Sequence, residues 1–241
     1  MELTVLGCSG SFPTPRSGAS GYLVQHDGTS VWLDAGSGTL ANLQRHIDID
    51  DLDGIVITHA HPDHWVDVLS YYVLVGYYRK RTGVPVHSPA RVRELVTAVH
   101  GTVAPQLDWV DITKASRIAI GALSFSFSRT DHPGETLAVR VDAGGRSLGY
   151  SADTGPGWSL SELGAGMHLA LVESTFTVPE ERTGLHLSAR QAAVTAKAAG
   201  VPRLLLTHLQ PWLDPEVLRA EAEEAFGAPV MIATPNERYE V

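Results

Sequence analysis

The segment His59-Ala-His61-Pro-Asp63-His64 places four potential metal ligands within six residues. Imidazole nitrogens and carboxylate oxygens suit zinc, and the absence of a thiolate in the segment leaves manganese and iron open. His59 and His61 are two positions apart, so an extended chain would direct both side chains toward one cation. Asp63 and His64 come where the chain should turn into a helix, so they could hold a second cation. The spacing therefore predicts two metal ions.

A dinuclear centre needs more ligands, and three further polar residues each follow an apolar, strand-like segment. They are His132, Asp153 and His208. An aspartate can offer one oxygen to each of two ions, so Asp153 is the natural bridge. His132 then completes the site of one ion and His208 that of the other. Five other histidines are interpreted as hydrogen-bonded structural residues: His26, His46, His87, His100 and His168.

The chain that must position these residues mixes strand-like and helical patterns. Strands are predicted at 2–6, 20–26, 30–34, 54–58, 117–130, 136–142, 146–151, 169–172, 203–207 and 229–233. Helices are predicted at 38–46, 62–78, 89–100, 188–199 and 214–226. Ser188 and Asp214 are good N-cap candidates for the last two. The segment 123–128 alternates like a half-exposed antiparallel strand, whereas Gly54–Ile57 and Leu204–Leu206 indicate strands buried on both faces. Sheets covered by helices on their outer faces satisfy both patterns.

The bulk composition is that of a globular protein. A chain of 241 residues with 44% hydrophobic residues can bury a full core, and we expect a single domain over residues 1–241. The formal charge of -9 disfavours a long polyanionic partner, because phosphate backbones are bound by clustered cations. The single cysteine, Cys8, is interpreted as a small buried residue near a strand end. The first residues lack a basic segment and no apolar run approaches the length of a membrane span, so we expect a cytoplasmic protein.

Taken in this order, the motif at 59–64 and the later His132, Asp153 and His208 resemble the metallo-β-lactamase superfamily. The stretches VLGCSGSFPTPRSGASGYLV and WLDAGSGTL also resemble its phosphodiesterase and tRNA-processing endoribonuclease (RNase Z) branch, so the resemblance covers almost the whole chain. It implies an α/β fold, a four-layer αββα sandwich with the metal site at the edge where two sheets meet. It also implies that Asp34 supports the ligand loop from behind.

Two further residues match the RNase Z-like phosphodiesterases. Glu173 and His186 correspond to a glutamate and a histidine that those enzymes have beside the metals. The resemblance implies that the histidine assists the departing oxygen and that the glutamate orients it. The metals would hold the attacking hydroxide, steered by Asp63 and Asp153, but an alkoxide leaving group still needs a proton. A capping or surface role for His186 beside Ser188 is the alternative.

The spacing of the motifs bears on the substrate. The RNase Z enzymes resembled here carry a basic arm between the histidine and aspartate motifs, but Asp153 follows His132 by only 21 positions. Together with the acidic charge, this favours a small phosphodiester over long nucleic acid. The start of the chain and a short helix near residues 40–47 resemble compact bacterial cyclic-nucleotide phosphodiesterases. We therefore expect hydrolysis of a 3′,5′-cyclic nucleotide with two divalent ions, zinc first among them; the base stays open.

Several alternatives fit the same residues. The chain could be an RNase Z-like tRNA 3′-processing endoribonuclease, a thioester or lactone hydrolase of the same fold, or a metal-stabilised binding protein without activity. The resemblance also implies a homodimer. Four tyrosines could stack on a base, line a dimer contact or pack a helix on the sheet: Tyr71, Tyr72, Tyr77 and Tyr78.

Overall fold

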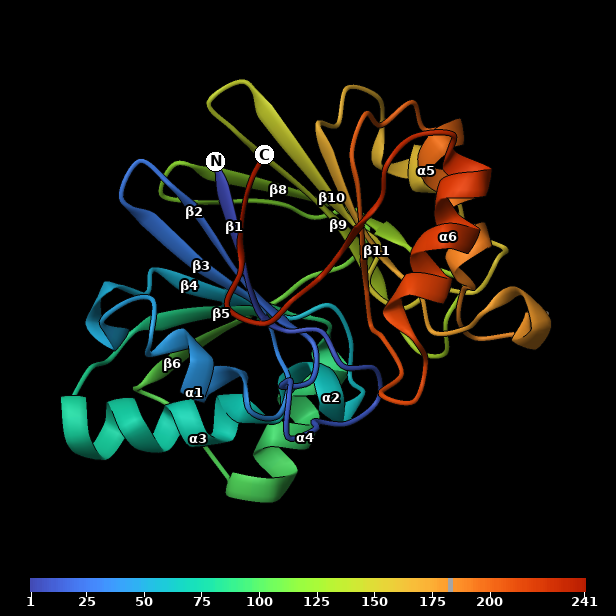
Figure 1. Ribbon diagram of the computed structural model, residues 1–241. Coiled ribbons are helices and arrows are strands. Elements are labelled where there is room, and N and C mark those ends of the chain that lie inside the picture. Colours follow the sequence, from blue (N-terminus) through green and yellow to red (C-terminus); the bar gives the residue numbers. More distant parts are fainter. Residues whose placement is uncertain (182–183) are drawn as a thin grey trace.

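The apolar segments of the chain form two β-sheets that pack face to face, as the computed structural model shows for residues 1–181 and 184–241 (Figure 1). The first sheet has the strand order β14-β1-β2-β3-β4-β5-β6. Its strands are β1 (Glu2–Gly7), β2 (Gly21–His26), β3 (Thr29–Ala35), β4 (Gly54–Val56), β5 (Val84–Ser88), β6 (Leu107–Asp111) and β14 (Arg238–Glu240). β1, β2 and β3 are antiparallel, and β3 to β6 are parallel.

The second sheet has the order β13-β12-β11-β10-β9-β8-β7. Its strands are β7 (Arg117–Ile120), β8 (Leu123–Arg129), β9 (Leu137–Ala143), β10 (Arg146–Tyr150), β11 (Leu169–Glu173), β12 (Leu204–Thr207) and β13 (Met231–Ile232). β7 to β10 form an antiparallel meander, and β10 to β13 are parallel. Both sheets are therefore mixed. β8, β10, β11 and β12 all run in one direction, so the loops that follow them emerge at the same edge.

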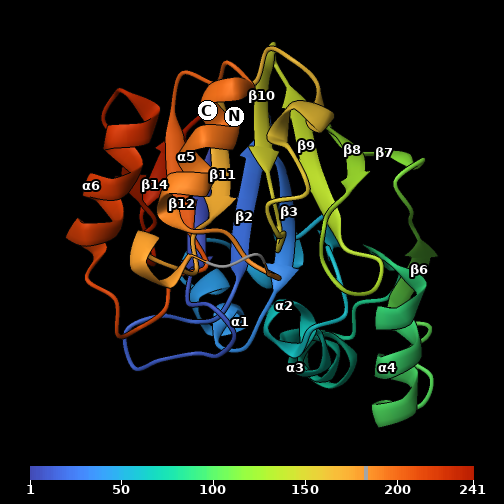
Figure 2. The same ribbon diagram turned by 90° about the vertical axis from the view of Figure 1, so that its right-hand side faces the viewer.

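Helices cover the outer face of each sheet (Figures 1 and 2). The helices over the first sheet are α1 (Thr39–Leu43), α2 (Pro62–Trp65), α3 (Asp67–Val73), the π-helix η2 (Leu74–Arg79) and α4 (Ala90–His100). Those over the second are α5 (Ala189–Ala198) and α6 (Pro215–Phe226). Short 3-10 helices are η1 (Ile49–Asp51), η3 (Leu160–Leu163) and η4 (Val178–Glu180). The predicted four-layer αββα sandwich is confirmed.

Three buried clusters hold the layers together, one at each junction. The middle cluster joins inward-facing residues of both sheets, such as Val31 and Phe125. A second cluster packs α1, α3 and α4 on the first sheet, with Trp32 against Tyr71 at its centre. A third packs α5 and α6 on the second sheet through small residues such as Ala192. Burial of apolar area at all three junctions provides the main stabilisation of the fold.

Some predicted strands need correction. β5, β6 and β14 were not predicted, and the predicted strand 117–130 is a hairpin of β7 and β8. Its turn includes Gly121, whose φ of 52° lies in the left-handed region that favours glycine. The predicted strand 229–233 is reduced to the two residues of β13. The buried runs were predicted correctly, since β4 and β12 are fully buried between parallel neighbours.

The predicted helices are present, but the segment 62–78 is divided into α2, α3 and η2. Ser188 caps α5 as predicted: its Oγ accepts from the amide of Gln191 at 3.1 Å. Tyr71 is fully buried and Tyr72 nearly so, which confirms the packing role for that pair, whereas Tyr77 and Tyr78 are exposed. Among the described residues, no helix is both long and apolar enough to cross a membrane.

Candidate metal centre

The loop after β4 carries the predicted metal motif. The strand ends at Val56, and the chain passes through His59 before α2 begins at Pro62 with His61 as its N-cap. Nε2 of His59 lies 3.2 Å from Nδ1 of His61, so the two rings meet although neither residue lies in a strand. The bend of the loop, and not the continued strand geometry that we expected, brings them together.

Asp34 anchors this loop from behind, as the resemblance implies. It lies near the end of β3 with a φ of 57°, an uncommon conformation for a residue with a side chain. Its Oδ1 accepts from the amide of Thr58 at 2.8 Å. Its Oδ2 accepts from the hydroxyl of Thr58 at 2.9 Å and from that of Tyr150 at 2.9 Å, and lies 2.8 Å from Nδ1 of His64. The strained Asp34 thus fixes both ends of the motif.

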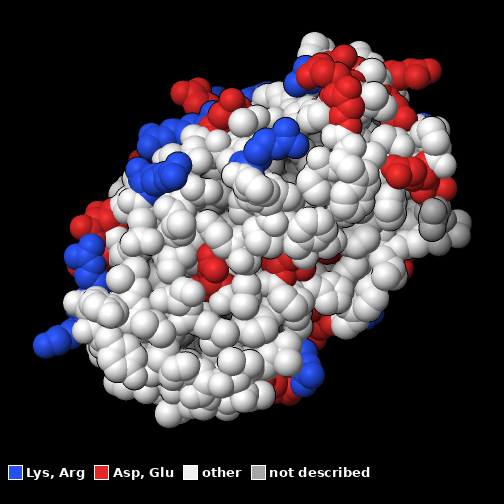
Figure 3. All heavy atoms as spheres, turned by 60° about the horizontal axis from the view of Figure 1, so that its bottom comes forward, with Lys and Arg blue, Asp and Glu red and all other residues white. Residues whose placement is uncertain are grey.

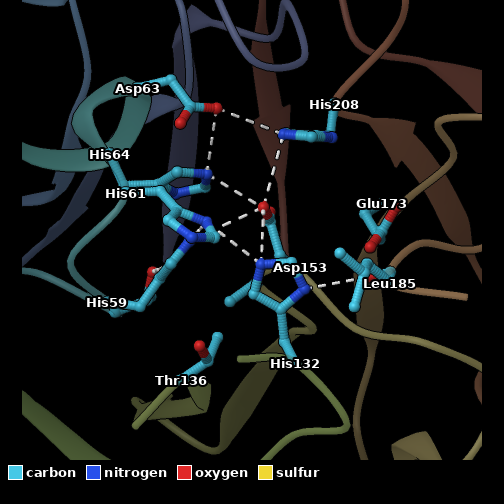
Figure 4. A network of polar contacts seen from close by, with 12 residues as sticks. His59, His61, Asp63, His64, His132, Thr136, Asp153, Glu173, Leu185 and His208 are labelled. Carbon is cyan, nitrogen blue, oxygen red and sulfur yellow. Dashed lines mark hydrogen bonds and ion pairs between the residues drawn. The ribbon is translucent and has the colours of Figure 1, made fainter. Parts of the chain in front are cut away.

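The second sheet contributes the other predicted ligands from three separate loops. His132 follows β8, Asp153 follows β10 and His208 follows β12. Their side chains point toward the motif and meet around the Asp153 carboxylate (Figure 4). Asp153 Oδ2 lies 3.6 Å from Nε2 of His59, 3.7 Å from Nε2 of His132 and 3.6 Å from Nε2 of His208. Asp153 Oδ1 lies 3.2 Å from Nε2 of His64.

The ligand atoms separate into two neighbouring groups that share this carboxylate. One group combines His59, His61 and His132 with Asp153, and the other contains Asp63, His64 and His208. The candidate atoms within each group lie within 4.8 Å of one another. Asp63 Oδ2 is 3.5 Å from Nε2 of His64 and 3.4 Å from Nε2 of His208. The structure therefore brings together all seven predicted ligands, in the two sets that the spacing suggested.

Hydrogen bonds on the far side of the imidazoles determine which nitrogen faces the centre. Nδ1 of His132 donates to the carbonyl of Leu185 at 2.9 Å, and Nδ1 of His64 donates to Asp34. The hydroxyl of Thr58 donates its proton to Asp34. The hydroxyl oxygen of Thr58 therefore accepts from Nδ1 of His59 at 3.0 Å. These tautomers are assigned from the network, and each leaves an Nε2 lone pair directed inward.

His208 is oriented in the same way. The hydroxyl of Thr175 donates to Glu173 Oε2 at 2.9 Å and accepts from Nδ1 of His208 at 2.9 Å. Four histidines therefore direct unprotonated Nε2 atoms at the same space. Nitrogen lone pairs that face one another repel, and they are stabilised when they share a cation.

Two buried atoms test whether this donor set suits a metal. Nε2 of His64 and Oδ1 of Asp153 lie 3.2 Å apart without the geometry of a hydrogen bond, and neither has another partner among the described residues, although both are enclosed by protein. An unpartnered polar atom in the interior is costly, and coordination to a cation would satisfy both. Nitrogen and oxygen donors without sulfur fit zinc, manganese or iron. The residues present fit a pair of divalent ions.

The carboxylates of the centre are held in their ionised form. Burial alone would raise the pKa of Asp153, but the neighbouring His208 and His64 lower it well below its usual value. Burial is likewise outweighed at Asp63, where the proximity of His64 and His208 lowers the pKa well below its usual range. Burial and the proximity of His64 lower the pKa of His59 well below its usual value. Ionised carboxylates and a neutral His59 are the states that metal ligands require. Burial would lower the pKa values of His64 and His208, but the carboxylate of Asp153 raises both, so a bound cation would have to displace a proton there.

His186 and Glu173 lie beside the centre, on the side of the second sheet. Glu173 is fully buried at the end of β11, and its Oε1 accepts from the amide of Thr154 at 2.7 Å. The same oxygen lies 3.0 Å from Nδ1 of His186, whose ring centroid is 5.1 Å from that of His208. Burial would lower the pKa of His186, but Glu173 raises it to about 9. Ser188, and not His186, caps α5.

Sequence reasoning missed the residues that orient the ligands. Thr58, Thr175 and Tyr150 were not singled out, nor was the amide of Ser11, which donates to Asp63 Oδ2 at 3.0 Å. The only signal was proximity, because Thr58 immediately precedes the motif. The other five histidines belong to none of the candidate ligand groups found among the described residues. Cys8 is buried directly after β1 as predicted, and burial raises the pKa of its thiol to about 11.

Comparison with known proteins agrees with this geometry. A family model described as "Beta-lactamase superfamily domain" matches residues 29–209. The probable metallo-hydrolase YhfI of Bacillus subtilis is 30% identical over 243 residues, covering 97% of each chain. Its crystal structure superimposes with a TM-score of 0.91 over 99% of each chain at 27% identity. The ribonuclease Z of Myxococcus xanthus is 25% identical over 292 residues, covering 97% of this chain and 95% of the relative. A diphosphatase of the PhnP family has the same fold, with a TM-score of 0.78 at 19% identity, covering 100% of this chain and 97% of the diphosphatase.

The fold and the cluster of histidines and aspartates define a metallo-hydrolase of the β-lactamase fold. The matched model covers most of the chain, and the chain belongs to the β-lactamase superfamily.

Proposed function

We propose that the protein is a dinuclear metal-dependent phosphodiesterase whose substrate is a small phosphodiester, a 3′,5′-cyclic nucleotide. The observation that carries the proposal is the pair of ligand groups that both lie against Asp153, with His186 beside them, 3.0 Å from Glu173. Two divalent ions bound there, zinc first among the candidates, would supply Lewis acidity and an activated water. A phosphodiester anion fits such a site.

The chain's own residues would divide the remaining work. Asp63 is held in place by the Ser11 amide, and its carboxylate can orient the attacking water as well as hold an ion. His186 carries a proton that it can give to the departing ribose oxygen, and the buried Glu173 keeps its ring in position through Nδ1. A basic alkoxide needs that proton in order to leave.

The surface favours a small substrate. On the face shown in Figure 3, the Lys and Arg side chains of the described residues are scattered, and they form no continuous basic patch across its middle. The β9–β10 hairpin occupies most of the interval between His132 and Asp153. A substrate held through many phosphates would need clustered cations. The resemblance to ribonuclease Z keeps tRNA processing as the competing function.

The metal content is the first expected result. Protein reloaded with zinc should bind two ions per chain, because each ligand group supplies three side chains and Asp153 serves both. Elemental analysis of the dialysed protein measures the ratio. A value that stays at one or below after careful reloading with zinc, manganese and iron in turn would contradict the dinuclear centre.

The second expected result concerns the substrate. The reloaded enzyme should hydrolyse 3′,5′-cyclic nucleotides to nucleoside monophosphates, and aryl phosphodiesters as well, because both present a phosphodiester anion to the centre. A tRNA precursor and a thioester assayed under the same conditions serve as comparisons. Cleavage of the tRNA precursor far faster than of any cyclic nucleotide would reverse the assignment. Full metal loading without activity on any of them would favour a binding protein.

A further inference from the structure

Two aromatic side chains, Phe12 and Trp212, lie exposed on neighbouring loops. They are 44% and 66% exposed, and their rings stack with centroids 6.4 Å apart and planes inclined by 30°. Stacking on each other covers only part of their surface, so a large apolar area still faces solvent. Exposed apolar surface of this kind commonly marks a binding site.

Both loops are tied directly to the candidate metal centre. The residue before Phe12 is Ser11, whose amide donates to Asp63. Trp212 comes four positions after His208, and the amide of Gly10 donates to the carbonyl of Leu209 at 3.0 Å between the two loops. Figures 1 and 2 show the two loops side by side, beyond the ends of the sheets. The two loops that carry the aromatic pair are therefore connected, within a few residues, to the ligand group that contains Asp63 and His208.

The chemistry of these loops suits an uncharged planar group. Neither the segment 9–15 nor the segment 209–213 contains a charged residue. Pro13 and Pro15 follow Phe12, and Pro211 precedes Trp212, so the backbone near each ring has little freedom to lose on binding. A pre-arranged neutral aromatic surface beside an anion-binding centre matches a ligand with a phosphate at one end and an aromatic ring at the other.

We propose that Phe12 and Trp212 form the platform on which the nucleobase of the substrate stacks while its phosphodiester lies at the metal centre. This inference rests on the proposed function. Stacking tolerates every base, because each base has a π-face, so the platform provides affinity for nucleotides as a class. The selection between substrates is therefore aromatic against non-aromatic, and not one base against another.

Inhibition by two small phosphates isolates the base. Adenosine 5′-monophosphate and ribose 5-phosphate carry the same phosphate and sugar, and differ in the adenine. In Trp212→Ala, the inhibition constant of adenosine 5′-monophosphate should rise by about 5- to 100-fold, and that of ribose 5-phosphate should change little. The KM for 3′,5′-cyclic adenosine monophosphate should rise in parallel, with kcat nearly unchanged. Phe12→Ala should act in the same direction, and Trp212→Phe should retain most of the affinity.

Tyr78→Ala is the matched control, because Tyr78 is 77% exposed but lies at the end of η2, away from both loops. It should change neither inhibition constant. Equal weakening of both phosphates in Trp212→Ala would overturn the platform, as would unchanged constants for both. A change in sedimentation coefficient with both constants unaltered would instead make the pair a contact between two copies of the chain.

The two proposals fail in different ways. If the metal-loaded wild-type protein hydrolyses no cyclic nucleotide, the proposed function fails, and calorimetric binding of the same two phosphates still tests the platform. If hydrolysis is present and Trp212→Ala leaves the KM and both inhibition constants unaltered, the proposed function stands and the platform is wrong.

Discussion

Asp153→Ala should lose both metal ions and nearly all hydrolytic activity. The carboxylate lies within 3.7 Å of Nε2 atoms from both ligand groups, so its removal leaves each group one ligand short. Mutation of a residue that only orients a metal ligand commonly lowers metal affinity or activity about 10- to 100-fold. The loss of activity on removal of a shared ligand should therefore exceed about 100-fold. Elemental analysis and the rate on an aryl phosphodiester measure the two losses.

Asp108→Ala is a suitable control for the loss of one negative charge, because Asp108 is an exposed residue of the edge strand β6. It should keep two ions and full activity. Circular dichroism should show that Asp153→Ala still folds. Retention of both ions by Asp153→Ala, with activity near that of the wild type, is the result that would remove Asp153 from the bridging position.

His186→Ala should keep both ions and still slow the hydrolysis of a cyclic nucleotide by on the order of 10²- to 10⁴-fold, the range for loss of a general acid. The ribose oxygen leaves as a strongly basic alkoxide and needs the proton that His186 carries. A phenolate is a much weaker base and leaves without that help. The rate on an aryl diester should therefore fall much less, and the ratio of the two losses measures proton donation.

Glu173→Gln should show the same pattern in a milder form, because it keeps the shape of the side chain but removes the charge beside Nδ1 of His186. Equal losses on both substrates with the metals intact would assign His186 to substrate positioning. Loss of a metal ion in His186→Ala would instead make His186 a metal ligand. Its ring nitrogen lies within 4.8 Å of ligand atoms of Asp153 and His208, which is compatible with that role.

Most residues of the candidate site could be selected from the sequence because polar, metal-binding residue types stand directly after apolar strand patterns. His132, Asp153 and His208 could be selected because each follows an apolar strand, and parallel strands deliver their ends to one edge. The orienting partners could not be selected. Tyr150 bonds Asp34 across 116 positions, and no local pattern encodes such a contact. Tautomers likewise depend on the far side of each ring, which spacing does not describe.

The fold was predictable where burial follows a simple period. β5 was missed because Pro85 and His87 interrupt its apolar pattern, and the short edge strand β14 has one partner and little to bury. The hairpin at 117–130 was predicted as one strand because both arms alternate with period two, although the phase shifts at the turn. The missed strands extend the first sheet, and all ligands except those of the 59–64 motif come from the second.

The uneven origin of the ligands has a consequence for the unfolded chain. Four of the seven ligands lie within a six-residue segment, so an unfolded chain retains a local chelator, whereas His132, Asp153 and His208 assemble only on folding. A ligand stabilises the native state only to the extent that it binds the native state more tightly than the unfolded one. The affinity that the 59–64 segment retains in the unfolded chain therefore contributes nothing to the stabilisation of the native state. The three loops of the second sheet, and not the motif that first identifies the site, carry most of the thermodynamic linkage between metal binding and folding.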